Sequence, residues 1–212
     1  VIRIEVIPSE DWANLNRYSK ANAELPAVDK NRVVFMGNSI TEGWVRLRPE
    51  FFQKNPYNGR GISGQTTAQM LLRFRPDVIN LNPKIVVINA GTNDIAANRG
   101  PQTLEQIMGN IKSMVQLAKA SDIKVVLASV LPASSFGWRP AIYPADKIIE
   151  LNKMIKAYAE DNDCLYLDYY SAMVNSNKGL KKEYGRDSVH PNVDGYKVME
   201  ELAVEAIEIM LK

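Results

Sequence analysis

Hydrophobic and polar positions along the chain follow two alternating patterns. Short runs, most of them apolar at nearly every position, predict strands at residues 32–36, 57–61, 85–89, 124–129 and 164–168. Between them, apolar residues recur every three or four positions, which predicts helices up to residue 53 and at residues 67–81, 103–120, 145–161 and the C-terminal end. This alternation predicts one α/β domain with a three-layer α/β/α architecture, in which helices cover both faces of a parallel sheet.

The same spacing predicts which helix faces are buried. In residues 67–81, where Pro76 is expected to break or kink the helix, the apolar positions are Ala68, Leu71, Leu72, Val78 and Ile79. In the last helix they are Met199, Leu202, Ala203, Ala206, Ile209 and Met210. Residues 11–24 are also predicted to be helical. They belong to an N-terminal extension, residues 1–30, that we expect to pack on a single domain spanning residues 31–212.

The amino-acid composition and charge limit which classes of binding partner are expected. The 212 residues are 46% hydrophobic and 24% charged, with a formal net charge of +2, as in an ordinary globular domain. Lysine and arginine form no basic run, so we expect no nucleic-acid partner. No apolar run reaches the ~18–20 residues of a membrane-spanning helix. Because the chain starts at Val1 and not at methionine, a processed leader with a periplasmic or secreted location stays open, as does a cytoplasmic one. The oligomeric state is also open.

Single copies of cysteine and histidine limit the chemistry. Cys164 excludes an internal disulfide, and its apolar, strand-like surroundings favour a buried, inert thiol over a nucleophile. His190 is the only imidazole of the chain, so any histidine-dependent reaction must use it. Ordinary zinc hydrolase sites need several histidine or cysteine ligands. We therefore expect neither a metal nor another cofactor.

Polar loops follow the predicted strands at one edge of the sheet. Gly37–Thr41 follows the first strand, Gly61–Thr66 the second and Gly91–Asp94 the third, while Asp187–Pro191 precedes the last helix. Open parallel sheets place functional loops beyond the carboxyl ends of their strands. These loops supply a hydroxyl, a flexible glycine backbone, a side-chain amide and an acid–base pair, which are the groups that acyl transfer requires.

The residue types in these loops fit a serine hydrolase. The hydroxyl of Ser39 would become nucleophilic when the imidazole of His190 removes its proton. A carboxylate holds such an imidazole in the required tautomer, and Asp187 lies on the same side of a turn at i,i+3 spacing. The backbone N–H groups of Ser39 and Gly64 and the amide of Asn93 are candidate donors to the oxyanion. A purely structural histidine would not explain the nearby aspartate and the matching upstream loops.

Four segments resemble the sequence blocks of the SGNH hydrolases, also called the GDSL family. They are Arg32–Trp44 (RVVFMGNSITEGW), Asn58–Ala68, Val86–Asp94 (VVINAGTND) and Asp187–Pro191. Their order and spacing agree with the family from about residue 31 to the end of the chain. Through residues 61–81 the match is similar to the catalytic subunits of platelet-activating-factor acetylhydrolase, a branch that also contains bacterial carbohydrate esterases.

The resemblance implies a fold, a site and a reaction. The fold would be a flavodoxin-like parallel sheet. Ser39 would be the nucleophile, His190 the base, Asp187 its orienting partner, and Gly64 and Asn93 would complete the oxyanion hole. The reaction would be hydrolysis of short-chain acyl esters, acetyl esters above all, on a small molecule or carbohydrate. A lipid-type acylhydrolase, a thioesterase with the same triad and a non-catalytic carbohydrate-binding relative are the alternatives.

Three further residues are candidates for substrate binding. Asn38 stands where the family has aspartate, which keeps the size and one acceptor but removes the charge. We expect altered electrostatics in the nucleophile loop with activity retained. Trp138 and Arg139 lie in a proline-rich loop, residues 131–145. The aromatic residues of this loop fit either a substrate wall or a cap on the core, whereas Trp44 is expected to pack between helices.

Two other site types fit the sequence less well. Gly59–Gly64 matches the dinucleotide-binding pattern Gly-x-Gly-x-x-Gly, but no long buried strand precedes it. The acidic residue downstream, Asp77, is expected on the polar face of a helix and not at a strand end. The nucleophile elbow of α/β-hydrolases is Gly-x-Ser-x-Gly, and Thr41 occupies the position of its second glycine.

Overall fold

A five-stranded parallel sheet forms the centre of the molecule. The structure is a computed structural model that describes residues 11–26 and 31–212. The strands are β1 (Val33–Gly37), β2 (Tyr57–Gly61), β3 (Ile85–Ile88), β4 (Lys124–Ala128) and β5 (Leu165–Leu167). They are parallel throughout, in the order β2-β1-β3-β4-β5. This is the flavodoxin-like strand order, and it confirms the predicted fold class.

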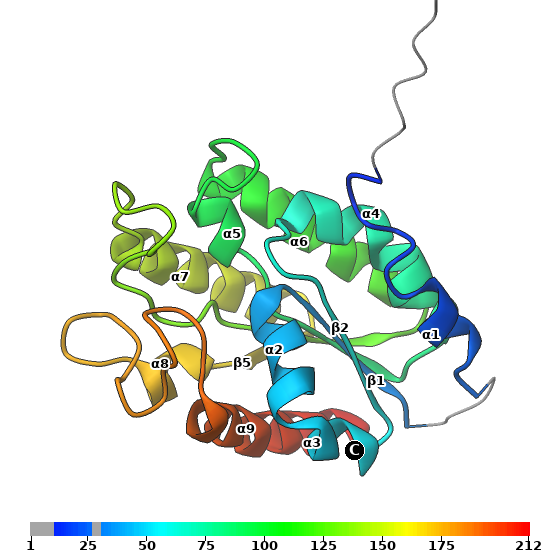
Figure 1. The fold of residues 1–212 in the computed structure, drawn as a ribbon. Coiled ribbons are helices and arrows are strands. Elements are labelled where there is room, and N and C mark those ends of the chain that lie inside the picture. Colours follow the sequence, from blue (N-terminus) through cyan, green and yellow to red (C-terminus); the bar gives the residue numbers. More distant parts are fainter. Residues whose placement is uncertain (1–10, 27–30) are drawn as a thin grey trace, which may run out of the picture.

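Helices cover both faces of this sheet (Figure 1). One face carries α4 (Thr67–Asp77), α6 (Leu104–Lys119) and α7 (Ala145–Asp161), and the other carries α2 (Ser39–Leu47), α3 (Pro49–Gln53) and α9 (Val193–Leu211). The shorter elements are α1 (Ser19–Ala23), the 3₁₀ turn η1 (Ile79–Leu81), α5 (Thr92–Ile95) and α8 (Tyr169–Met173). None of the described helices is long and apolar enough to cross a bilayer.

Two hydrophobic cores lie on opposite faces of the sheet because side chains alternate along each strand. In β1, Val34 and Met36 belong to the core under α4 and α6, whereas Val33 and Phe35 belong to the core under α2 and α9. All four are at most 2% exposed. Burial on both faces explains why the sequence of β1 is apolar throughout.

The helical segment that follows β1 is two helices, where the sequence pattern had predicted one. Pro49 is the first residue of α3, a position that tolerates its missing N–H. The resulting bend lets Trp44 stack on Phe51 at 5.1 Å and on Tyr196 of α9 at 5.7 Å between ring centroids. This confirms the expected packing role of Trp44, which is 2% exposed.

The predicted helix over residues 11–24 is wrong for most of its length, since only Ser19–Ala23 is α-helical. The backbone carbonyls of Trp12 and Ala13 accept hydrogen bonds from the side chains of Gln69 and Gln65. Asn14 adopts a left-handed conformation with φ of 54°. These carbonyls are used for contacts with the domain, so they are not available to a helix in this segment.

The predicted apolar face over residues 67–81 is only partly correct, since Val78 and Ile79, which follow α4, are buried in the core but Leu72 is not. Leu72 is 57% exposed, and the buried face carries Met70 and Phe74 together with Gln69, Arg73 and Asp77. Hydrogen bonds to the neighbouring strand ends and loops make it possible to bury these polar side chains. Pro76 lies in the last turn of α4, which ends one residue later.

Two smaller expectations need correction. In α9 the buried residue near the C-terminus is Ile207, whereas Ile209 is 52% exposed. Cys164 is half-buried, not fully buried, and its thiol donates to the Asn162 carbonyl. Burial nevertheless raises the pKa of this thiol, which disfavours the nucleophilic thiolate.

Candidate active site

Ser39 begins α2, directly after the carboxyl end of β1. The preceding residue, Asn38, caps this helix by accepting a hydrogen bond from the Ile40 backbone N–H at 2.9 Å. Asn38 is 1% exposed and is not among the residues that line the cavity beside Ser39. The structure therefore gives Asn38 a capping position below the serine, in place of the substrate contact considered from the sequence.

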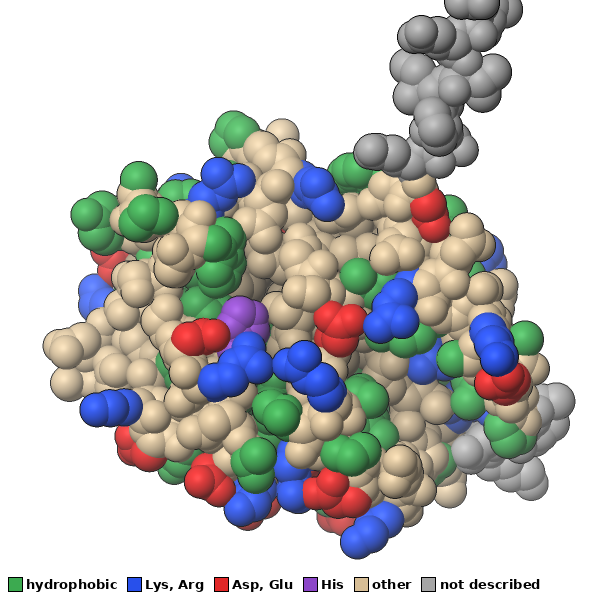
Figure 2. All heavy atoms as spheres, in the orientation of Figure 1, with side chains coloured by type: hydrophobic (Ala, Val, Ile, Leu, Met, Phe, Trp, Pro, Cys, Tyr) green, Lys and Arg blue, Asp and Glu red, His purple; other side chains and the backbone are tan. Residues whose placement is uncertain are grey.

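Ser39, His190 and Asp187 form a continuous chain of hydrogen bonds. Ser39 Oγ lies 3.0 Å from His190 Nε2, and His190 Nδ1 lies 2.9 Å from Asp187 Oδ2. A carboxylate can only accept, so Nδ1 carries the imidazole proton and Nε2 is the acceptor facing the serine. Figure 2 shows the histidine, in purple, near the middle of this face, with acidic and basic side chains beside it.

Asp187 is held as an ionised acceptor. Partial burial raises its pKa, but donation from the backbone N–H groups of His190 and Val189 and from the His190 ring outweighs this effect. The pKa of Asp187 therefore lies below its ordinary value. The carboxylate is thus charged throughout the range in which an imidazole titrates.

Helix α9 fixes the turn that carries this pair. Asn192 caps α9 by accepting from the Gly195 N–H at 2.9 Å, and the Arg186 N–H donates to the His190 carbonyl at 2.8 Å. The hydroxyl of Tyr196, in the first turn of α9, donates to the Ile40 carbonyl of α2 at 2.8 Å. The helices that position the histidine and the serine are therefore bonded directly to each other.

A cavity of about 230 Å³ opens beside Ser39. Its lining residues are Ser39, Ser63, Gly64, Asn93, Asn98, Trp138 and His190. Gly64 has a φ of +77°, a conformation that favours glycine. Among the described residues, neither the Ser39 N–H nor the Gly64 N–H has an acceptor. The structure thus brings all of the proposed oxyanion donors to one cavity.

Asn93 and Asp94 join this cavity to helix α4. Asn93 Nδ2 donates to the Gln65 carbonyl at 2.9 Å. Asp94 is 1% exposed and accepts from both the N–H and the hydroxyl of Thr67, the first residue of α4. Burial raises the pKa of Asp94, and the bonds from Thr67 oppose this shift. The loops after β2 and β3 are therefore fixed to each other.

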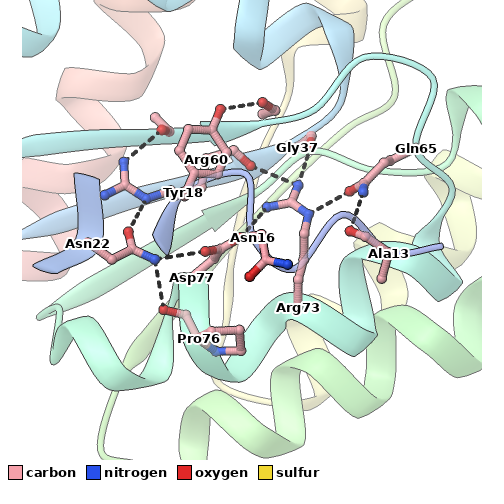
Figure 3. Close-up of polar contacts among 12 residues, drawn as sticks. Ala13, Asn16, Tyr18, Asn22, Gly37, Arg60, Gln65, Arg73, Pro76 and Asp77 are labelled. Carbon is pink, nitrogen blue, oxygen red and sulfur yellow. Dashed lines mark hydrogen bonds and ion pairs between the residues drawn. The ribbon is translucent and has the colours of Figure 1, made fainter. Parts of the chain in front are cut away.

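A buried guanidinium, missed by the sequence analysis, braces the same loops (Figure 3). Arg73 of α4 donates to the carbonyls of Gly37 and Arg60 at 2.9 Å each, and to the side chain of Gln65. Asp77 pairs with it at 3.0 Å, so the acid is buried and not on a polar surface as expected. Arg73 thereby connects the ends of β1 and β2 to the loop of Gly64. Its i,i+4 spacing with Asp77 was the one available signal in the sequence.

The loop at residues 131–145 contributes one side chain to the core and another to the lining of the cavity. Phe136 is fully buried in the core, whereas Trp138 is 43% exposed and its ring centroid lies 6.2 Å from that of His190. Arg139 does not line the cavity, and its guanidinium lies 3.5 Å from the Ala97 carbonyl. The cap on the core and the cavity wall are therefore different residues of one loop.

The glycine pattern at residues 59–64 has a packing explanation. A Cβ on Gly61 would lie 2.3 Å from the Glu42 backbone nitrogen, and one on Gly59 would lie 2.2 Å from the Val45 side chain. Both glycines thus allow β2 to approach α2. This contact accounts for the pattern without a dinucleotide.

Ala97 adopts a strained backbone conformation beside the cavity, with a φ of 52°. Side chains with a Cβ are disfavoured in this left-handed region by about 1–2 kcal/mol, and glycine is not. Ala97→Gly is therefore expected to stabilise the fold by up to about 1 kcal/mol, which would raise the melting temperature by roughly 2–4 °C for a chain of this size. Thermal unfolding measures this shift, and an unchanged or lower melting temperature would contradict it.

The chain is similar to known proteins over most of its length. The family model described as GDSL-like Lipase/Acylhydrolase matches residues 35–198. A Bacteroides fragilis protein solved at 2.00 Å is 58% identical with a TM-score of 0.93, covering 96% of this chain and 100% of that one. A GDSL-like lipase from Bacteroides thetaiotaomicron is 55% identical with a TM-score of 0.90, covering 92% of this chain and 98% of that one.

Curated relatives are more distant. Esterase TesA of Pseudomonas aeruginosa is 27% identical over 74% of this chain and 73% of its own length. Human platelet-activating factor acetylhydrolase IB subunit alpha1 is 28% identical over 89% of this chain and 82% of its own. An acetylxylan esterase of Xylanibacter ruminicola is 24% identical over 86% of this chain but only 44% of its own length.

Proposed function

The chain belongs to the GDSL-like lipase/acylhydrolase family of ester-cleaving hydrolases, and we propose that it releases short acyl groups, acetyl above all, from carbohydrate esters through an acyl-enzyme on Ser39. The observation that carries this proposal is the unbroken hydrogen-bond chain from Asp187 through His190 to Ser39, with links of 2.9 and 3.0 Å. This is the arrangement that activates a serine hydroxyl for acyl transfer.

The proposed reaction has two steps. His190 Nε2 accepts the Ser39 proton while Oγ attacks the ester carbonyl carbon, and the charge that develops on the carbonyl oxygen faces the N–H groups of Ser39 and Gly64 and the amide of Asn93. The alcohol leaves with the proton from His190. In the second step a water gives its proton to His190 and attacks the acyl-enzyme. As this second intermediate collapses, His190 returns its proton to Ser39 Oγ, the bond from Oγ to the acyl carbon breaks and the carboxylic acid is released.

The size and polarity of the cavity support a short acyl group. Its volume of about 230 Å³ lies below the ~300–1,000 Å³ of typical drug-sized ligand sites. Trp138 is the one large apolar side chain among its lining residues, so the wall offers little surface to a long alkyl chain. Two of the relatives reported above, the platelet-activating factor acetylhydrolase and the acetylxylan esterase, bear names that specify acetyl release.

Aromatic side chains support a carbohydrate as the alcohol part. Trp138 at the cavity is 43% exposed, and Tyr143 on the same loop is 82% exposed. Exposed aromatic rings present an apolar face with a polar edge, which suits the faces and hydroxyl groups of sugar rings.

A panel of substrates tests this specificity. We expect kcat/KM for p-nitrophenyl esters to fall at least about tenfold from acetate to octanoate, which corresponds to about 1.4 kcal/mol of lost transition-state binding. Acetylated xylo-oligosaccharides should be cleaved as well, and Trp138→Ala should raise KM for them more than for p-nitrophenyl acetate. Equal or faster cleavage of the octanoate would favour a lipid-type acylhydrolase instead.

A further inference from the structure

Three side chains at the cavity form a second series of hydrogen bonds, which passes through the Asn93 amide and ends at a backbone carbonyl. Trp138 Nε1 donates to Asn98 Oδ1, Asn98 Nδ2 donates to Asn93 Oδ1, and Asn93 Nδ2 donates to the Gln65 carbonyl, each at 2.9 Å. Trp138 comes from the loop before α7, and Asn98 follows α5. These hydrogen bonds therefore connect the cavity wall to the loop of Gly64.

Both ends of this series fix its direction. An indole N–H can only donate and a backbone carbonyl can only accept. Asn98 must therefore present its oxygen to Trp138, which leaves its NH₂ group for Asn93. Asn93 must in turn present its oxygen to Asn98 and its NH₂ group to Gln65. One hydrogen of that NH₂ group is used by Gln65, and the other has no acceptor among the described residues.

The backbone holds Asn98 in place for this contact. The Asn98 N–H donates to the Asn93 carbonyl at 3.0 Å, and the Ala97 N–H donates to the Asp94 carbonyl at 2.9 Å. These bonds close α5 through the left-handed conformation of Ala97, at φ 52°. Strain of this kind, in a residue other than glycine, is typical of functional sites. Here the turn returns Asn98 to the side chain of Asn93.

We propose that Asn98 is a positioning residue that fixes the orientation of the Asn93 amide, so that its NH₂ group and not its oxygen faces the oxyanion. This inference rests on the proposed function, because it assumes that Asn93 stabilises that charge. Without Asn98, only the bond to the Gln65 carbonyl opposes a half-turn of the Asn93 amide, and that half-turn would present an acceptor to developing negative charge. Because the oxyanion exists in the transition state and not in bound substrate, the loss falls on kcat and not on KM.

Asn98→Leu tests the inference, because leucine has a similar size and shape but no donor and no charge. Removing one oxyanion donor outright costs about 10²–10³ in kcat, so losing its orientation should cost about tenfold or more within that limit. We expect this fall on p-nitrophenyl acetate, with KM changed less than about twofold. The matched control is Asn55→Leu. It removes one half-buried hydrogen bond, from the Asn55 amide to the Phe51 carbonyl, at the amino end of β2 and thus at the opposite edge of the sheet. This variant should leave kcat unchanged.

A double-mutant cycle with Asn93→Ala decides whether Asn98 acts through Asn93. In the Asn93→Ala background, Asn98→Leu should change kcat less than about twofold, because the group that it positions is gone. An equal fall in both backgrounds, or wild-type kcat in Asn98→Leu, would overturn the inference. If the leucine variant does not fold, Asn98→Ala completes the cycle, since it also cannot donate to Asn93 and adds no charge to the cavity.

The same cycle separates this inference from the proposed function. If Asn93→Ala lowers kcat but Asn98→Leu does not, only the positioning role of Asn98 fails. If Asn93→Ala leaves kcat unchanged, both the oxyanion role of Asn93 and the inference fail. Activity that survives Ser39→Ala would overturn the proposed function, whatever the cycle shows.

Discussion

Ser39→Ala is expected to lower kcat for p-nitrophenyl acetate by about a millionfold, the loss seen when the nucleophile of a serine triad is removed. No other hydroxyl lies within hydrogen-bonding distance of the His190 ring among the described residues. The alanine cannot form the acyl-enzyme, and the oxyanion donors alone leave only a small residual rate.

Initial rates measured with purified protein check this expectation. The substitution removes one oxygen at the cavity and no core contact, so circular dichroism and the melting temperature should stay close to those of the wild type. A folded Ser39→Ala protein with a rate within about tenfold of wild type would exclude the serine mechanism.

His190→Gln should cause a loss of similar size, because base and nucleophile act as one unit. In the wild type, kcat/KM should rise with pH as the imidazole loses its proton, since only the neutral ring can accept from Ser39. The depressed pKa of Asp187 keeps that carboxylate ionised over the same range. The rise therefore reports the histidine and not the aspartate.

A pH–rate profile of both proteins tests this assignment. The residual activity of His190→Gln should lack the rise with pH. Asp187→Asn supplies the comparison, because it removes the charged acceptor and should lower kcat by about 10⁴ through the wrong tautomer. A pH-dependent rise that persists in His190→Gln would assign the titration to another group.

The sheet and the meeting of the four loops could be predicted because both depend on short-range patterns. Strands buried on both faces are apolar throughout, as in Val33–Met36, and parallel strands bring their carboxyl ends to one edge. Glycine, serine and asparagine directly after such strands therefore mark the site without knowledge of helix packing. Ser39, Gly64 and Asn93 all line the same cavity for this reason.

Most of the polar contacts beneath and beside the site could not be predicted, because they include partners that are distant in sequence. Helical spacing assigned Leu72 to the core, whereas Arg73 is fully buried because carbonyls of β1 and β2 accept its hydrogens. The N-terminal segment is similar, since Tyr18 donates to the Gly61 carbonyl 43 residues away. No periodic pattern in the sequence marks Asn98, and its contact with Trp138 joins residues that are 40 positions apart.

Covalent labelling tests the central claim, that Ser39 is an activated nucleophile, most directly. Wild-type protein treated with a fluorophosphonate should gain one adduct per chain by intact-mass spectrometry, on the peptide that contains Ser39, and lose activity in proportion. Ser39→Ala should remain unmodified, and His190→Gln should react far more slowly because its serine lacks a base. An adduct on a different residue, or full activity after complete modification of Ser39, would contradict the account.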